Sequence, residues 1–192
     1  YQKAAEGGSP QGQLGYALVL ARNTDSPETQ AELLRHLRQA AEKGLATALY
    51  LYGMVQERGV NMPQDRAAAA ACYKQAAEKG HHGAQARWGY ALMNGNGVEA
   101  HPVEGESWLR RAALAGDREA AALVGDIYAK GGNLPPNYAE AAMWFRRAAD
   151  GNHRGAARAL GMLYLTGAGV ARDQDEAARL FRIAVVLLQF GA

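Results

Sequence analysis

The chain carries a sequence repeat of 36 residues, and this repeat constrains the fold more than any other feature. Alanine recurs six times at this spacing, and from the second unit onward a glycine lies in the middle of each unit. The alanines are Ala4, Ala40, Ala76, Ala112, Ala148 and Ala184, and the glycines are Gly53, Gly89, Gly125 and Gly161. A fixed period of about 20 to 50 residues is typical of a solenoid, in which one supersecondary unit stacks on the next. The sequence therefore predicts one elongated array of similar units.

The repeat divides the chain into five units and a fragment. The predicted parts are the tail of a preceding unit at 1–8, a degenerate first unit at 9–44, and further units at 45–80, 81–116, 117–152 and 153–192. In the degenerate unit Ala17 replaces the mid-unit glycine, and the last unit ends in an apolar extension. Because the first residue falls inside a unit, we expect the natural chain to start upstream, with a signal or lipidation sequence removed.

Residues 117–152 show what each unit builds. Asp117 is expected to cap a helix that runs to about Lys130, and Asn137 a second helix over about 138–150, because both side chains accept hydrogen bonds from free backbone N–H groups. No segment alternates apolar and polar residues with a period of two, as a half-buried strand does. The sequence therefore predicts an all-α protein of helix–loop–helix units.

Glycines and tryptophans of the units are expected to be structural. A glycine inside a helix costs about 1 kcal/mol relative to alanine, so Gly125 and its equivalents indicate the close approach of a neighbouring helix. Gly131 and Gly132 are expected to end their helix with left-handed backbone angles. Trp108 and Trp144 fall at the core-facing phase of the second helices and are expected to pack there.

Composition and charge exclude several kinds of partner. The net charge is only +2, with no run of Lys or Arg, so neither nucleic acid nor an anionic membrane surface is expected. No stretch of 18 apolar residues is present, so direct membrane insertion is not expected. A single cysteine, Cys72, leaves no internal disulfide and no multi-cysteine metal site.

Residues capable of chemistry have simpler structural explanations. His81 and His82 are adjacent, so they do not share a helix face as two metal ligands would, and a position at a helix start explains them. Cys72 occupies the position that holds tryptophan in the units with Trp108 and Trp144, so we expect it to pack in the core. The sequence accordingly predicts no catalytic residue, no cofactor, no metal and no enzyme activity.

The repeated residues resemble the Sel1-like repeat family, a relative of the tetratricopeptide repeat. The fifth unit carries its pattern at Ala156, Leu160, Gly161, Tyr164, Gly167, Gly169, Val170, Asp173, Ala177 and Ala184. The resemblance implies a right-handed α/α superhelical solenoid of about five units that binds a partner protein, as a monomer or weak homo-oligomer. It also implies a bacterial protein of the periplasm or the secreted space, with the cytoplasm as an open alternative.

The resemblance leaves three functions open. The first is a non-enzymatic scaffold or adaptor of bacterial envelope machinery. The second is a periplasmic immunity protein that neutralises a secreted phospholipase toxin of a type VI system. The third is a regulatory or accessory module of an enzyme whose catalytic region lies outside this chain.

A partner is expected on the first helices, which line the concave face of such arrays. Positions on this face differ between units while core positions repeat, and they are Tyr50, Met54, Glu57, Arg58, Tyr90, Met93, Asn94, Asp126, Lys130, Arg158 and Met162. Tyr50, Met54, Tyr90 and Met93 are expected to form an apolar strip suited to a peptide or a loop. The alternative is that some of these four pack against neighbouring helices. Some tetratricopeptide proteins bind a C-terminal carboxylate with a set of lysine and asparagine residues on this face. The equivalent positions of this chain lack that set.

The C-terminal segment is apolar on more than one helix face. The residues are Ile183, Val185, Val186, Leu187, Leu188 and Phe190. A terminal solenoid unit needs a polar outer face. Three explanations stay open: the segment bends back as a cap, the parent protein continues, or a partner or a second copy covers it.

Overall fold

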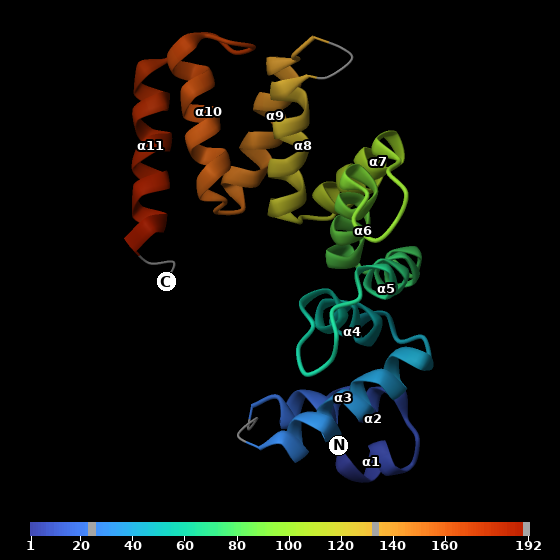
Figure 1. Cartoon of the computed structure of the whole chain (residues 1–192). Coiled ribbons are helices and arrows are strands. Elements are labelled where there is room, and N and C mark those ends of the chain that lie inside the picture. Colours follow the sequence, from blue (N-terminus) through green and yellow to red (C-terminus); the bar gives the residue numbers. More distant parts are fainter. Residues whose placement is uncertain (23–25, 132–134, 190–192) are drawn as a thin grey trace. The chain divides into compact units, whose positions relative to one another are not determined.

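The computed structural model describes residues 1–22, 26–131 and 135–189, and in these ranges it contains eleven α-helices and no strand (Figure 1). The helices are α1 (Gln2–Glu6), α2 (Pro10–Leu20), α3 (Pro27–Glu42), α4 (Ala46–Arg58), α5 (Arg66–Glu78), α6 (His82–Asn94), α7 (Pro102–Leu114), α8 (Arg118–Lys130), α9 (Tyr138–Asp150), α10 (Arg154–Thr166) and α11 (Gln174–Gln189). The even-numbered helices from α2 are the first helices of the units, and the odd-numbered helices from α3 are the second helices. The predicted all-α repeat architecture is confirmed.

Two compact units, Tyr1–Gly105 and Glu106–Ala192, divide the chain within α7. Consecutive helices pack inside each unit, α4 on both α3 and α5 in the first and α9 on both α8 and α10 in the second (Figure 1). The sequence predicts one array without such a division. The difference has a physical reason, because each repeat of a solenoid contacts mainly its sequence neighbours and no shared core unites all the repeats.

The predicted helix boundaries in the fourth unit are confirmed. The Asp117 carboxylate accepts a hydrogen bond of 2.9 Å from the backbone N–H of Ala120, and the Asn137 side chain accepts one of 3.1 Å from Glu140. At the end of α8, Gly131 has a positive φ of 67° as expected, but its ψ of −156° lies outside the left-handed helical region. Gly132, the second predicted helix stop, lies outside the described residues.

The alanine repeat marks the helix-packing core. Ala40, Ala76, Ala112 and Ala148 are fully buried, and Ala184 is nearly so. Ala4 is the exception, since it is exposed on the short α1. The 36-residue period therefore records where helices pack closely.

Most mid-helix glycines lie against aromatic rings of the following helix. A Cβ atom built at Gly53 would lie 2.8 Å from Tyr73, and one at Gly161 would lie 2.8 Å from Phe181. The equivalent distance from Gly125 to Phe145 is 2.6 Å. These separations are too short for a side chain, so the predicted close approach is confirmed at these three positions. Gly89 is buried inside α6.

The tryptophan position of the second helices is a packing position, as expected. Trp144 is buried, while Trp108 is half-buried with the Arg111 guanidinium 4.6 Å from its ring centre. Cys72 is half-buried, its Sγ donates a hydrogen bond of 3.3 Å to Gln56 Oε1, and burial raises the pKa of its thiol.

The last helix, α11, carries exposed apolar residues near its end. Val185 and Val186 are exposed. The side chains of Leu187 and Leu188, and Phe190 altogether, lie outside the described residues. No helix in the described ranges combines the length and the apolar character that a bilayer crossing requires.

Candidate functional site

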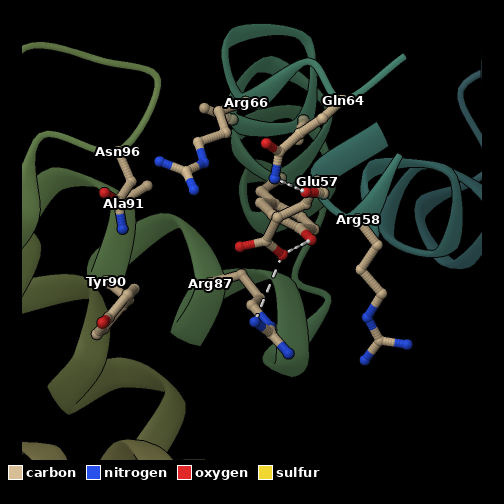
Figure 2. A pocket seen from close by; sticks show the side chains of 11 residues that line it. Glu57, Arg58, Gln64, Arg66, Arg87, Tyr90, Ala91 and Asn96 are labelled. Atoms are coloured by element: carbon tan, nitrogen blue, oxygen red, sulfur yellow. Dashed lines mark hydrogen bonds and ion pairs between the residues drawn. The ribbon is translucent and has the colours of Figure 1, made fainter. Parts of the chain in front are cut away.

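An arginine-rich cavity of about 360 Å³ lies between α4, α5 and α6 of the first unit. We call it the arginine pocket. Its charged and aromatic lining residues are Glu57, Arg58, Arg66, Tyr73, Arg87 and Tyr90. Figure 2 shows Arg66 on one side of Glu57 and Arg87 on the other. A dashed line marks the ion pair between Arg87 and Glu57. The floor includes the small side chains of Ala69, Ala70 and Ala91, which leave the cavity open.

Local helix geometry positions these side chains. Arg58 is the last residue of α4, because Gly59 takes a left-handed conformation with a φ of 69°. Arg66 is the first residue of α5, because Asp65 caps that helix through a 2.9 Å hydrogen bond from Ala68 N–H. Residues three apart share a helix face, so α6 presents Arg87 and Tyr90 to the cavity together.

A polar cluster joins the three helices at the wall of the pocket. The Tyr73 hydroxyl donates a hydrogen bond of 2.6 Å to Glu57 Oε2, and Arg87 Nη1 lies 3.4 Å from the same oxygen. Tyr73 is only 3% exposed. Burial, followed by the hydrogen bond to Glu57, raises the pKa of the Tyr73 phenol far above its ordinary value. The phenol therefore stays protonated and holds the carboxylate in place.

The arginine pocket has an excess of positive charge. Three arginines and one glutamate line it, and the Glu57 carboxylate already interacts with Tyr73 and Arg87. Arg58 and Arg66 are exposed, and their side chains form no hydrogen bond or ion pair with the described part of the chain. Because a guanidinium matches carboxylate and phosphate groups in shape and charge, the pocket is suited to an anionic group.

The polar cluster stands at positions that are apolar in the other repeats. Tyr73 is equivalent to Leu37, Leu109, Phe145 and Phe181. Glu57 is equivalent to Ala21, Met93, Ala129 and Leu165, and Arg87 is equivalent to Leu51, Leu123 and Ala159. The other repeats thus pack their helices without these polar groups.

The equivalent cavity one repeat earlier is apolar. It has a volume of about 200 Å³ and lies between α2, α3 and α4. Its lining includes Leu33, Leu37, Leu51, Met54, Val55 and Val60, each 36 residues before a residue of the arginine pocket. Arg58 borders both cavities. We call this second cavity the apolar pocket.

The four residues of the predicted apolar strip divide into two kinds. Tyr90, which is 42% exposed, lines the arginine pocket, and Met54 lines the apolar pocket. Tyr50 instead stacks on His81 with ring centres 4.5 Å apart, and its ring lies 3.2 Å from where a Cβ of Gly83 would be. Met93 packs 2.9 Å from the corresponding position of Gly105. Two of the four thus face cavities, and two pack against neighbouring helices.

The other predicted surface residues occupy both units. Glu57 and Arg58 line the arginine pocket, and Asn94 is exposed with its amide donating to the Tyr90 carbonyl at 2.9 Å. In the second unit the remaining residues are exposed on α8 and α10, namely Asp126, Lys130, Arg158 and Met162. Of the predicted surface residues, Glu57, Arg58 and Tyr90 thus line the arginine pocket, and all three belong to the first unit.

Arg66, Tyr73 and Arg87 were not predicted as site residues. Arg66 and Tyr73 lie on a second helix, where the sequence pattern predicts only packing. A comparison between repeats could have identified two of them, because Tyr73 and Arg87 are polar at positions that are apolar in the other repeats.

The histidines at helix starts act as caps. His81 Nδ1 accepts a hydrogen bond of 3.2 Å from Ala84 N–H, and His153 Nδ1 accepts one of 2.9 Å from Ala156 N–H. Burial, with the positive charge of His82, lowers the pKa of His81. Among the described residues, no group of three or more His, Cys, Asp or Glu side chains is placed to hold a metal ion.

Together these features define a helical-repeat solenoid with cavities at successive seams between its helix pairs, a fold that suggests a scaffold for protein–protein interaction. The Sel1 repeat family model matches residues 1–9, 46–81, 82–117, 118–153 and 155–185, so the chain belongs to the Sel1 repeat family. No curated protein matches the sequence.

Solved structures of bacterial proteins share the fold. A Sel1 repeat protein from Oxalobacter formigenes is 30% identical, with a TM-score of 0.85 over 96% of this chain and 54% of its own. A protective antigen of uropathogenic Escherichia coli is 26% identical, with a TM-score of 0.89 over 96% of this chain and 40% of its own. The chain thus spans about half the length of these relatives or less. An immunity protein from Pseudomonas aeruginosa, 17% identical with a TM-score of 0.60 over 97% of this chain and 72% of its own, shares the fold alone.

Proposed function

We propose that the chain is a non-enzymatic scaffold that binds a partner protein through the arginine pocket and the surface around Tyr90. The observation that carries this proposal is the polar cluster of Glu57, Tyr73 and Arg87 at positions that are apolar in the other repeats. Sel1 repeat proteins are generally scaffolds without catalytic activity, which agrees with a binding role.

The energetics of the cluster support a binding role. Buried or half-buried ion pairs contribute little net stability, because the cost of removing charges from water offsets most of their attraction. Apolar residues at these positions build the same helix contacts in the other units. A cluster that the fold does not need is expected to serve recognition, as sequence rules are most often broken at functional sites.

We further propose that the scaffold serves bacterial envelope machinery, in the periplasm or the secreted space. The solved structures of similar proteins come from bacteria, which supports a bacterial setting. The immunity-protein alternative has the fold likeness to the Pseudomonas aeruginosa protein in its favour, at a sequence identity of only 17%.

The proposal can be tested by affinity capture from an extract of the source bacterium. The bait is the purified chain, as wild type, as Tyr90→Ala and as Tyr138→Ala. Tyr138 is a matched control, because it is 41% exposed and lies in the other unit. We expect one or more proteins to be captured by the wild type and by Tyr138→Ala, but to be strongly depleted with Tyr90→Ala.

Two results would overturn the proposed function. One is that every captured protein binds the wild type and Tyr90→Ala equally. The other is that Tyr138→Ala, and not Tyr90→Ala, loses the captured protein. Thermal melts of both variants ensure that a difference in capture reflects the surface and not unfolding.

A further inference from the structure

We infer that the arginine pocket and the apolar pocket together bind an extended segment of the partner that carries one acidic and one apolar side chain. This inference rests on the proposed function and adds the chemistry of the ligand. It follows from the contrast between two equivalent cavities at neighbouring seams of the same unit.

The two pockets are the same structural position in consecutive repeats. Leu51 of the apolar pocket is equivalent to Arg87 of the arginine pocket, and Met54 is equivalent to Tyr90. Helix α4 separates the pockets, and Arg58 at its end borders both. A single segment that crosses the end of α4 therefore meets both cavities in succession.

The arginine pocket favours a carboxylate. Arg58 and Arg66 have no ion-pair partner within the described part of the chain, whereas Arg87 is held by Glu57. Both arginines line the cavity, so a carboxylate that enters it can pair with an unmatched guanidinium group, and charge-assisted hydrogen bonds of this kind are among the strong ones. Since the whole chain carries a net charge of only +2, with no basic run, a protein segment fits better than a nucleic acid.

The apolar pocket favours an aliphatic or methionine side chain. Leu33, Leu51 and Met54 present only hydrocarbon and thioether groups to the cavity. Small and flexible apolar linings of this kind accept side chains of varied shape, and methionine adapts most readily. An apolar anchor beside a charged one specifies both the register and the direction of the bound segment.

The helix spacing sets the distance between the two anchors. Neighbouring packed helices lie about 8 to 10 Å apart, and an extended chain advances about 3.3 Å per residue. Side chains two or four residues apart lie on the same face of an extended chain, so the acidic and apolar side chains are expected about two or four residues apart.

The test uses synthetic peptides with a glycine and serine background and a fluorescent label. One series carries Glu and Leu separated by one to six positions, and matched peptides replace Glu by Gln or Leu by Ser. Affinities for the full chain are measured by fluorescence anisotropy. We expect the best Glu–Leu peptide to bind about tenfold more tightly than its Gln–Leu match, as one charge-assisted contact implies.

Protein variants assign the two anchors. Arg66→Gln is expected to weaken the Glu–Leu peptide about tenfold and to leave the Gln–Leu peptide unchanged. Arg154→Gln is the matched control, because Arg154 is also exposed and is also the first residue of its helix. Met54→Gln is expected to remove the preference for Leu over Ser while the preference for Glu over Gln persists.

Glu57→Gln separates a recognition role from a structural one. Loss of this charge frees the Arg87 guanidinium, so the Glu–Leu peptide is expected to bind more tightly, whereas a merely structural role would weaken binding. If Glu57→Gln does not fold, Glu57→Met provides the residue that the next repeat uses at this position.

Three outcomes would overturn the inference. They are equal binding of the Glu and Gln peptides, equal loss with Arg66→Gln and Arg154→Gln, and competition by inorganic phosphate without any preference among peptides, which indicates a general anion site. None of them affects the capture experiment with Tyr90→Ala, so the proposed function and this inference fail separately.

Discussion

Gly125 on α8 lies against the ring of Phe145 on α9, so closely that a Cβ atom at Gly125 would fall 2.6 Å from both Cδ1 and Cε1 of the ring. The same relation joins Gly53 to Tyr73 and Gly161 to Phe181. The degenerate unit has Ala17 at the glycine position and Leu37 at the ring position. In three units the glycine is therefore paired with an aromatic ring, whereas Gly89 is paired with Leu109 at the ring position.

Gly125→Ala is expected to destabilise the protein. Overpacking of a close contact costs about 1 to 3 kcal/mol, and the better helix propensity of alanine returns about 1 kcal/mol at most. The double variant Gly125→Ala with Phe145→Leu reproduces the Ala17 and Leu37 pair and is expected to be more stable than Gly125→Ala with the ring intact. Urea unfolding monitored by circular dichroism measures both. A Gly125→Ala protein as stable as wild type would contradict the steric explanation.

Arg147 on α9 is expected to stabilise the end of α7. Its Nε donates a hydrogen bond of 2.8 Å to the Ala113 carbonyl, and its Nη2 donates one of 2.8 Å to the Leu114 carbonyl. Arg147→Met removes both bonds, and we expect a loss of about 1 to 2 kcal/mol in the free energy of unfolding. Arg147→Lys is expected to recover part of this loss. Arg182→Met, at an exposed position of α11, is the control and is expected to change stability little.

The stability of the protein is expected to fall as the pH falls below about 6.5, the ordinary pKa of histidine. Burial, with the charge of His82, lowers the pKa of His81 in the folded state, so the unfolded chain takes up a proton first and acid favours unfolding. A protonated Nδ1 also ceases to accept the hydrogen bond from Ala84 N–H.

His81→Asn tests this pH dependence. Asparagine keeps a capping acceptor and does not titrate, so the fall in melting temperature between pH 7.5 and pH 5.5 is expected to be smaller than in wild type. Part of the fall is expected to persist, because burial, with the charge of Arg35, also lowers the pKa of His36. An unchanged fall in the variant would show that His81 does not contribute.

Local sequence signals predicted the helices and their ends, because caps and glycine stops act within a few residues. Asp117 and Asn137 start the helices that the sequence predicts. The spacing of Gly125 and its equivalents predicted close helix contacts, although not the aromatic rings that fill them. The two-unit division of the chain has no such local signal.

The candidate site was predicted only in part, because it depends on contacts between helices. Glu57 and Tyr90 were expected on the binding face, and both line the arginine pocket. Tyr50 was expected beside them, but the stacking on His81 depends on the packing of the next unit and has no sequence pattern. Arg66 comes from a second helix, and only the folded chain brings it beside Glu57.

The polar cluster is expected to be replaceable without loss of stability. Glu57→Met alone leaves the Tyr73 hydroxyl and Arg87 without their acceptor, and an orphaned buried polar group costs about 1 to 3 kcal/mol. The triple variant Glu57→Met, Arg87→Leu and Tyr73→Phe introduces residues that other repeats carry at these positions.

We expect the triple variant to be at least as stable as wild type, since exchange of an ion pair for packed apolar residues is often neutral or stabilising. The free energy of unfolding then departs from the sum of the three single changes, as it does for residues that act as one network. The captured partner is expected to bind this variant more weakly, because the wall of the arginine pocket has lost its charges. A triple variant that is much less stable than wild type, yet binds the partner normally, would show that the cluster serves the fold.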